Sequence, residues 1–379
     1  ANDNCKKIYV TDDNPRNESP KKIRKEIVKN IIKDKAFEIS NRSLAIKKAI
    51  YSADPNDVIL VAGKGHEEEQ IYKNKILNIS DKKIIKTINP KIKILTKKEL
   101  NYFQNKLILS NILGKIKQVN FDGLSIDTRS MRKNNLFLAI KGKKNDGNKF
   151  VNDALKKGAG CVVSSLTKKK INKKIIKIKN EIFFLNKFAR LKREKSLAQI
   201  IAITGSAGKT SLKNLIKDLL LNFGKTFSSP KSFNNHLGVP ISLSNLSYDD
   251  KFGVFEVGMS KTGEIKNLTK LIRPHIGLIT NVGEAHIENF ENISGIAKAK
   301  SEIIEHIETG GTIILNRDDK FFKFLSRKAK KFKLKIYTFA KNKKANVWVK
   351  KIVKKGDKSK IFINVDKAKI NLIIQDLNI

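Results

Sequence analysis

Short apolar runs alternate along this chain with stretches whose apolar residues recur every three or four positions. Helix-like patterns cover three segments: 20–33, 42–51 and 149–157. The first of them begins with Pro20. The apolar runs are four to six residues long, as buried strands are, and lie at 8–11, 58–62, 136–140, 200–203, 252–257, 276–281 and 312–315. This alternation predicts an α/β protein whose mostly parallel sheet is covered by helices.

One strand-like run, 200–203, leads into the glycine-rich segment Thr204–Ser211, and a helix pattern follows. The predicted apolar face of that helix is Leu212, Leu215, Ile216, Leu219 and Leu220. Glycines let several backbone N–H groups point at one anion, Lys209 adds positive charge, and the Thr210 hydroxyl can ligate Mg²⁺. A glycine turn beside a chance lysine is the simpler alternative. The order of strand, turn and helix favours a nucleoside triphosphate site instead.

The spacing within this segment differs from the common phosphate loop. Only Ser206 and Ala207 separate the first glycine from the Gly208-Lys209 pair, whereas the common form has four residues there. Ile203 occupies the position where the long form would need glycine. The segment is therefore a shortened phosphate loop.

Polar residues follow two further strand-like runs. Glu256 follows residues 252–255 of the first run, and Asn281 through His286 follow residues 276–280 of the second. Ligands of parallel sheets bind at the carboxyl ends of strands, where a carboxylate is a natural Mg²⁺ ligand. Alone, Glu256 could equally be a solvated strand end, and a lone histidine is usually a surface residue. Together with the phosphate loop they favour a metal or phosphate role.

Composition restricts the class of protein. The 379 residues allow two or three domains, and the 40% hydrophobic content fits a globular protein. No run of about 18 apolar residues occurs, so we expect no membrane span. The start has neither an initiator Met nor an apolar signal core, which fits a start inside a longer gene product. Cys5 and Cys161 are the only cysteines, so we expect a reducing cytoplasm.

The formal net charge of +43 invites a nucleic-acid interpretation, which the pattern does not support. Only ten of the 79 basic residues are Arg, although Arg forks suit phosphate and base recognition best. The lysines are spread along the chain among Ile and Asn, with no accompanying aromatic motif. We therefore expect no nucleic-acid partner, and attraction to anionic nucleotides as a side effect.

Four segments in order resemble the ATP-dependent Mur ligases. They are the shortened loop 204–210, the Glu256 strand end, 281–286 and 297–303. Within that family, residues 106–340 look like the members that add D-Ala-D-Ala to UDP-N-acetylmuramoyl-tripeptide. The local patterns that carry this finer resemblance are 125–130, 232–240, 256–259 and 316–319.

The resemblance implies a role for each matching position. The γ-phosphate of ATP would move to the terminal carboxylate of the tripeptide, and the dipeptide amine would attack the acyl phosphate. Lys209, Glu256, His286 and Lys300 would be catalytic, with Lys300 carbamoylated. Thr210, Glu256 and His286 would hold Mg²⁺. ATP would be bound by Gly205, Ser206, Ala207, Gly208, Lys209, Thr210, Ser211, Asn281, Asn316 and Asp319. The tripeptide substrate would contact Asp127, Arg129 and Ser130 at its UDP end and Asn234 and Asn235 at its sugar-peptide part.

Residues 13–18 and 63–67 resemble a different domain, the C-terminal domain of the Mur ligase that adds the third peptide residue. The Asn14-Pro15-Arg16 form goes with meso-diaminopimelate in that family. Arg16 would bind its distal carboxylate, and Asn14, Gly63 and Glu67 its other end; Arg42 also matches a family position.

The expected organisation joins pieces of two ligases. We expect a Rossmann-like domain at 1–95, a linker at 96–105, a UDP-precursor domain at 106–188, an ATP-binding domain at 189–315 and the start of an incomplete C-terminal domain at 316–379. Either a natural fusion or a degraded gene would give this arrangement. The function expected is an amide ligase of peptidoglycan precursor synthesis. The alternatives are a catalytically inactive nucleotide-binding fragment and another Mur or folylpolyglutamate ligase.

Overall fold

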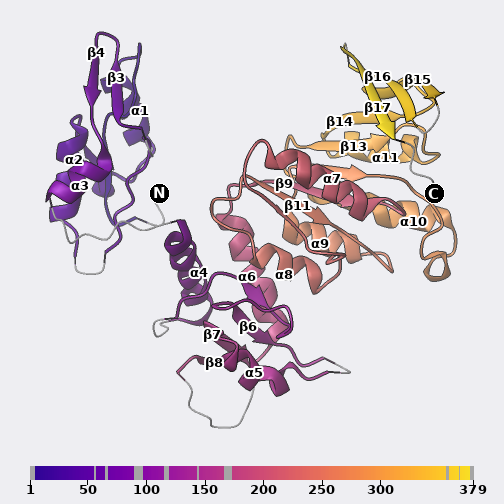
Figure 1. Ribbon diagram of the computed structural model, residues 1–379, viewed down its shortest axis with the longest axis horizontal. Coiled ribbons are helices and arrows are strands. Elements are labelled where there is room, and N and C mark those ends of the chain that lie inside the picture. Colours follow the sequence, from indigo (N-terminus) through magenta and orange to yellow (C-terminus); the bar gives the residue numbers. More distant parts are fainter. Residues whose placement is uncertain are drawn as a thin grey trace. The chain divides into compact units, whose positions relative to one another are not determined.

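The computed structural model describes residues 5–54, 57–64, 67–88, 97–114, 119–142, 145–165, 173–355, 358–366 and 368–375. Within it the chain forms two compact units, 1–96 and 97–379, and each is described by itself (Figure 1). The finer domain boundaries expected within the second unit stay predictions.

The first unit is a small α/β fold. Strand β1 (Ile8–Val10) pairs in parallel with β2 (Ala36–Glu38), and β3 (Glu69–Tyr72) forms a hairpin with β4 (Lys75–Asn78). The helices are α1 (Pro20–Lys29), the short η1 (Lys33–Lys35), α2 (Arg42–Tyr51) and α3 (Asp81–Ile88). Local chemistry sets their starts: Pro20 occupies the first turn of α1, and the Asn41 side chain caps α2.

The expected strand at 58–62 is wrong. These residues form no strand, and Val58, Ile59 and Leu60 are 47%, 38% and 75% exposed. Among the described residues the parallel sheet of this unit consists of β1 and β2, which leaves the run without a neighbouring strand to complete its backbone hydrogen bonds. An apolar run specifies burial only where a partner is present.

The second unit begins with helix α4 (Lys97–Leu113), where a connector was expected. A four-stranded sheet follows, with all of its pairings parallel. Its strands are β5 (Leu124–Ser125), β6 (Leu136–Ala139), β7 (Cys161–Ser164) and β8 (Ile175–Lys177), and its helices are η2 (Gly147–Phe150), α5 (Val151–Lys156) and α6 (Glu181–Lys195). Strand β8 runs parallel to β7. Residues 166–172 lie outside the described residues.

A nine-stranded sheet dominates the second unit, in the order β10-β11-β9-β12-β13-β14-β15-β16-β17. The pairings from β10 to β15 are parallel, and those of β15, β16 and β17 are antiparallel, so the predicted mostly parallel sheet is confirmed. The strands are β9 (Gln199–Thr204), β10 (Thr226–Ser228), β11 (Phe252–Glu256), β12 (Ile276–Ile279), β13 (Thr312–Asn316), β14 (Lys335–Ala340), β15 (Val347–Lys355), β16 (Lys358–Val365) and β17 (Ala368–Gln375).

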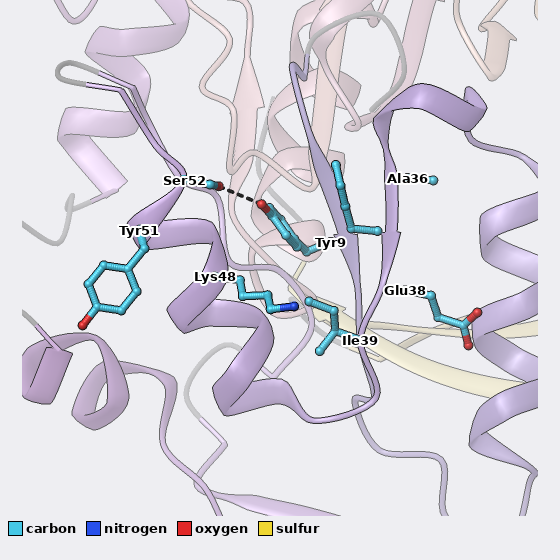
Figure 2. A pocket seen from close by; sticks show the side chains of 8 residues that line it. Tyr9, Ala36, Glu38, Ile39, Lys48, Tyr51 and Ser52 are labelled. Atoms are coloured by element: carbon cyan, nitrogen blue, oxygen red, sulfur yellow. Dashed lines mark hydrogen bonds between the residues drawn. The ribbon is translucent and has the colours of Figure 1, made fainter.

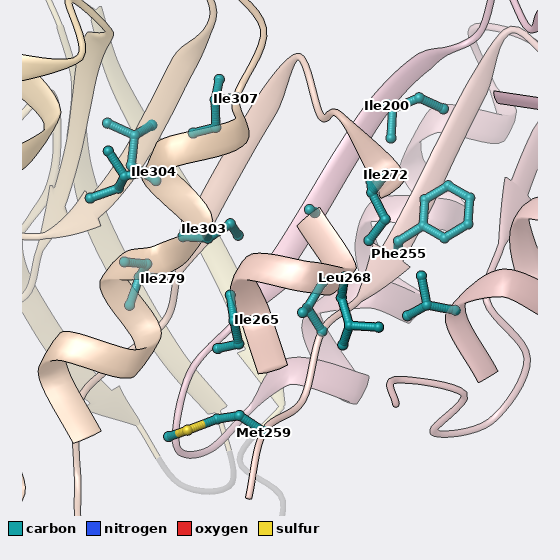
Figure 3. Packing of buried hydrophobic residues seen from close by; sticks show 14 of the residues in the cluster. Ile200, Phe255, Met259, Ile265, Leu268, Ile272, Ile279, Ile303, Ile304 and Ile307 are labelled. Atoms are coloured by element: carbon teal, nitrogen blue, oxygen red, sulfur yellow. The ribbon is translucent and has the colours of Figure 1, made fainter. Parts of the chain in front are cut away.

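Helices cover this sheet and bury side chains on both of its faces. They are α7 (Lys209–Leu221), α8 (Gly238–Ser244), α9 (Glu264–Ile272), η3 (Ile287–Asn289), α10 (Ile293–Ser301), η4 (Glu302–His306) and α11 (Phe322–Lys331). Ile200 and Phe255 face a large core with Ile265 and Leu268 of α9 (Figure 3). Strand residues alternate between faces, so Ile201 and Ile203 pack on the opposite side.

Helix α7 packs on that opposite side through a narrower face than expected. Leu212, Ile216 and Leu220 pack there, four residues apart. Leu215 and Leu219 were expected on the same face but are 61% and 64% exposed. They lie on a neighbouring row of the helix surface, which the sheet does not reach.

Residues 316–375 extend the same sheet. Strand β14 pairs in parallel with β13 over five residue pairs, and β15 continues next to β14. The strands after 316 thus continue the sheet that begins with β9. The expected start of a separate domain at 316 stays a prediction. No described helix of the chain is long and apolar enough to cross a membrane.

Candidate nucleotide and substrate site

The phosphate loop lies between β9 and the start of α7, where the strand order reverses: β11 flanks β9 on one side and β12 on the other. Such switch points are where open α/β sheets bind ligands. Gly205 has φ +152° and Gly208 has φ +79°, both in the region that favours glycine. A Cβ on Gly205 would lie 1.8 Å from Thr280 Oγ1. The loop geometry therefore requires glycine at Gly205 for two separate reasons.

Residues after β12 hold the loop. Ser206 N donates to Asn281 O, and Ala207 N donates to Asn281 Oδ1, both at 3.0 Å. Thr280 Oγ1 donates to Ala207 O at 2.7 Å, and Ser206 Oγ accepts from Gly283 N at 2.8 Å. Asn281, expected at the nucleotide, thus contacts the loop itself. Its two oxygens organise the backbone that would receive phosphate.

Lys209 lies back over this loop, with Nζ 2.8 Å from Gly205 O. Partial burial lowers the pKa of Lys209, and the nearby Glu256 carboxylate opposes that shift. The next residues of α7 present their N–H groups at a helix N-terminus, which attracts anions. The site therefore combines backbone donors with the Lys209 cation. Ser211 is exposed at the same helix start.

Glu256, at the end of β11, is 1% exposed and gathers partners from two other elements. Thr210 Oγ1 donates to Glu256 Oε2 at 2.7 Å, and Asn234 Nδ2 donates to Glu256 Oε1 at 2.8 Å. Lys213 Nζ lies 3.8 Å from Glu256 Oε2. The structure thus brings Thr210, Asn234 and Glu256 together.

The donor set fits Mg²⁺, which prefers hydroxyl and carboxylate oxygens and keeps several waters or phosphate oxygens. Thr210 and Glu256 supply two such oxygens side by side. Among the described residues no group of three or more His, Cys, Asp and Glu side chains could hold a metal by itself. A cation here would depend on phosphate or water for its remaining ligands.

His286 and Lys300 differ in how they relate to this centre. His286 has φ +61°, its side chain is 53% exposed, and its Nδ1 lies 3.7 Å from Glu288 Oε1. In the described part of the chain, no hydrogen bond or ion pair joins His286 to Thr210 or Glu256. Lys300 is 2% exposed, and burial together with the neighbouring Lys209 charge lowers the pKa of Lys300 to about 8. Lys300 therefore belongs to the phosphate-loop centre electrostatically.

Asn316, the last residue of β13, and Asp319, three residues later, tie this strand end to the same centre. Asp319 Oδ2 accepts from Val282 N at 2.7 Å, which connects it to the segment that holds the loop. Asn316 Oδ1 accepts from Asp318 N at 3.0 Å and shapes the turn between them. The carboxyl ends of β9, β12 and β13 are thereby linked.

The residues expected to bind the UDP precursor are arranged separately. Arg129 donates to the Asp127 carboxylate at 2.7 Å, and this pairing lowers the pKa of Asp127 to about 2. Arg129 and Ser130 are exposed. Asn235 Oδ1 accepts from Gly238 N at 2.9 Å at the start of α8. Asn235 therefore has a capping role, whereas Asn234 reaches Glu256.

The predicted diaminopimelate residues of the first unit lie near one another. Asn14 Nδ2 donates to Glu67 Oε2 at 2.6 Å, and a Cβ on Gly63 would lie 2.7 Å from Asp13 Oδ2. Arg16 has φ +51° and lines a cavity of about 640 Å³ together with the β3–β4 hairpin. Gly65 and His66 of the same motif lie outside the described residues. Arg42 is buried and forms a two-pronged ion pair with Asp81, which makes it structural.

A second cavity in this unit, of about 590 Å³, contains no predicted site residue. It lies beside β1, β2 and α2 (Figure 2). Tyr9 and Ser52 face each other there, with 2.7 Å between their hydroxyl oxygens.

Lys213 was not among the residues predicted for this site. A lysine in a lysine-rich helix carries no signal by itself. Its spacing was the available clue, because Lys213 follows Thr210 by three residues and so lies on the same helix face.

Comparison with known proteins places three family models along the chain. The Mur ligase, glutamate ligase domain matches residues 1–65, the Mur ligase family, catalytic domain matches 120–202, and the Mur ligase middle domain matches 203–375.

Curated relatives carry the name UDP-N-acetylmuramoyl-tripeptide–D-alanyl-D-alanine ligase. The one from Rickettsia prowazekii is 36% identical over 230 residues, which cover 60% of this chain and 51% of the relative. The one from Buchnera aphidicola subsp. Baizongia pistaciae is 32% identical over 277 residues, which cover 72% of this chain and 59% of the relative. The chain spans about half the length of the first of these relatives.

Solved structures agree on the fold. A crystal structure of MurF from Acinetobacter baumannii matches with a TM-score of 0.62 at 25% identity, over 73% of this chain and 60% of that one. MurF ligase from Thermotoga maritima, in complex with ADP, matches with a TM-score of 0.58 at 24% identity, over 67% and 58%, and shows the fold alone. With three domain models of one family in succession and matching folds, the chain belongs to the Mur ligase family.

Proposed function

We propose that this chain is an ATP-dependent amide ligase that adds D-Ala-D-Ala to UDP-N-acetylmuramoyl-tripeptide. The observation that carries the proposal is the phosphate loop at Gly205–Thr210 beside the paired Thr210 and Glu256 oxygens. The names of the curated relatives support the choice of substrates.

The proposed reaction has two steps. The terminal carboxylate of the tripeptide attacks the γ-phosphorus of ATP, which forms an acyl phosphate and releases ADP. The amine of D-Ala-D-Ala then attacks the acyl carbon, the new amide bond forms, inorganic phosphate leaves, and the amine gives up a proton. Phosphoryl transfer leaves little covalent work to side chains, so positioning and charge neutralisation are the tasks of the protein.

The residues of the loop centre would divide these tasks. Lys209 would leave Gly205 O and bind phosphate oxygens, and the α7 N-terminus would neutralise their charge. Thr210 and Glu256 would hold Mg²⁺, which when bound draws charge from the phosphate oxygens. Lys300, as a carbamate, would add a negative group near the metal, whereas an ammonium there would repel it. His286 would join only after its exposed loop moves toward Glu256.

The test is phosphate release by the whole chain with ATP, Mg²⁺, UDP-N-acetylmuramoyl-tripeptide and D-Ala-D-Ala. We expect release to require both substrates and to fall at least 100-fold in Lys209→Ala. Lys217→Ala is the matched control, since Lys217 lies on the same helix and pairs with the exposed Asp218. ATP binding with no substrate-dependent release would instead identify an inactive nucleotide-binding protein.

For the first unit we propose a partial site for meso-diaminopimelate. The cavity lined by Arg16 and the Asn14–Glu67 hydrogen bond support it, as does the glutamate ligase domain match ahead of the other two matches. This order also supports a chain built from pieces of two Mur ligases. Because Arg16 would pair with a carboxylate, calorimetric titration with meso-diaminopimelate should show binding that Arg16→Ala weakens about tenfold. Equal binding by Arg16→Ala, with the exposed-lysine variant Lys22→Ala as control, would contradict this assignment.

A further inference from the structure

Lys213 is a buried cation beside the phosphate-loop centre. Its side chain is 1% exposed, although it lies on a helix with exposed residues before and after it. Lysine is rarely buried so completely without a partner. Burial lowers the pKa of Lys213, and Glu256 opposes that shift. A reason for burying this charge therefore has to lie in its immediate contacts.

Two contacts meet at Lys213 Nζ. The first is Glu256 Oε2, 3.8 Å away. The second is the backbone carbonyl of Lys231, which accepts a short hydrogen bond from Nζ. Lys231 has φ +46°, a backbone conformation that L residues seldom adopt without support. The Lys213 ammonium thus joins α7 to both the end of β11 and a strained turn.

That turn belongs to the segment 229–235, which leads to the predicted substrate residues. The segment also meets β11 through Ser229, whose Oγ accepts from Glu256 N at 3.2 Å. Asn234 binds Glu256 Oε1 through its side chain, and its carbonyl accepts from Gly258 N at 2.8 Å. Glu256 and the segment 229–235 are therefore fixed to each other, and Lys213 is their shared contact with the phosphate-binding helix.

We propose that Lys213 is a positioning residue that holds the Glu256 carboxylate and the segment 229–235 in place against helix α7. This inference rests on the proposed function, because Lys213 would fix the nucleotide-binding side of the site relative to its substrate-binding side. Thr210 and Lys213 reach the same carboxylate oxygen from one helix face, three residues apart. Loss of Lys213 would leave the buried Glu256 without the Lys213 ammonium and the Lys231 carbonyl without its donor.

A purely structural ion pair predicts a different outcome. In that case, removal of Lys213 would lower the unfolding temperature but leave the local dynamics at Asn234 and the Mg²⁺ requirement unchanged in the folded protein. A positioning role predicts that both change while the fold persists.

The experiment compares Lys213→Met with Lys217→Met, which removes a lysine one turn later on the same helix. The first readout is hydrogen exchange of the peptide that contains Gly258, whose N–H is bound by Asn234. We expect exchange at least tenfold faster in Lys213→Met and unchanged in Lys217→Met. The second readout is the ratio of ATP affinities with and without Mg²⁺, which should fall at least fivefold in Lys213→Met only.

Neither readout needs turnover. Both therefore test the role of Lys213 even if no phosphate is released and the proposed ligase function is wrong. Parent-like exchange and a parent-like affinity ratio in folded Lys213→Met would overturn the inference. If Lys213→Met does not fold, Lys213→Arg is the test variant. Arginine keeps the charge and the hydrogen-bond donors but places them on a longer side chain with a planar guanidinium group. A positioning role predicts a shifted Mg²⁺ ratio in Lys213→Arg, and a parent-like ratio would overturn it.

Discussion

Gly205 and Gly208 stand three residues apart in one loop, yet the structure restricts them differently. Both have positive φ. A Cβ on Gly205 would collide with Thr280 Oγ1, whereas a Cβ on Gly208 would meet no atom within 4 Å. At Gly205 a side chain is therefore disfavoured both by the backbone conformation and by lack of space. At Gly208 it is disfavoured by the backbone conformation alone.

This difference predicts unequal costs of the same substitution. Gly208→Ala should lower the free energy of unfolding by about 1 kcal/mol, the usual cost of a left-handed alanine. Gly205→Ala should cost on the order of 3 kcal/mol or more, since strain and overlap add. Urea unfolding followed by fluorescence of Trp348, the only Trp and part of the second unit, measures both. Equal costs would show that the contact with Thr280 is relieved at no expense.

At the scale of elements, helices α4 and α6 meet around a buried lysine. Lys192 of α6 is 2% exposed, and its Nζ donates to Asn101 Oδ1 at 3.3 Å and Gln104 Oε1 at 3.1 Å on α4. Burial lowers the pKa of Lys192 to about 7, with Asp250 opposing the shift. The two amide oxygens solvate the ammonium only in part.

The lowered pKa makes the stability of this helix pair depend on pH. Between about pH 7 and 10.5 the unfolded chain holds a proton on Lys192 that the folded chain has released, so stability should rise with pH across this window. Below pH 7 both states are protonated and the full penalty remains. Lys192→Met should reduce the slope of the free energy of unfolding against pH by up to about 1.4 kcal/mol per pH unit. Lys217→Met should leave this slope unchanged. Parallel slopes of the free energy of unfolding for the parent and Lys192→Met would refute this.

The elements that could be predicted from the sequence are those whose local pattern agrees with their surroundings. The bounds of α2 match the predicted 42–51, because Asn41 caps the helix, and the run at 200–203 lies within β9. The run at 58–62 failed because a strand needs a neighbour, and Leu215 failed because only a narrow row of α7 reaches the sheet. Pairing partners are not encoded in a local pattern.

The candidate site likewise contains residues that the sequence pattern predicts and residues that it does not. The loop, Thr210, Glu256 and Asn281 were predicted and lie together, because strand ends of a parallel sheet share one edge. Lys213 could not be singled out among the lysines, since its burial depends on a turn at Lys231 that is distant in sequence. His286 was expected at the centre, but the structure places it on an exposed loop.

At the scale of the whole molecule, the chain consists of two compact units and three successive matches to one family. The middle-domain match reaches residue 375, in agreement with the continuous sheet from β9 to β17. The phosphate loop, the Glu256 centre and the sheet that carries them therefore belong to one unit. We propose that this unit makes an amide bond.

Mass spectrometry of the nucleotide product detects the proposed amide bond. The whole chain is incubated with ATP, Mg²⁺, UDP-N-acetylmuramoyl-tripeptide and D-Ala-D-Ala, and each component is left out in turn. We predict that the precursor gains the mass of the dipeptide less one water only in the complete mixture, and that Lys209→Ala yields none. An unchanged precursor mass in the complete mixture, from folded protein that binds ATP, would contradict the proposed ligase function.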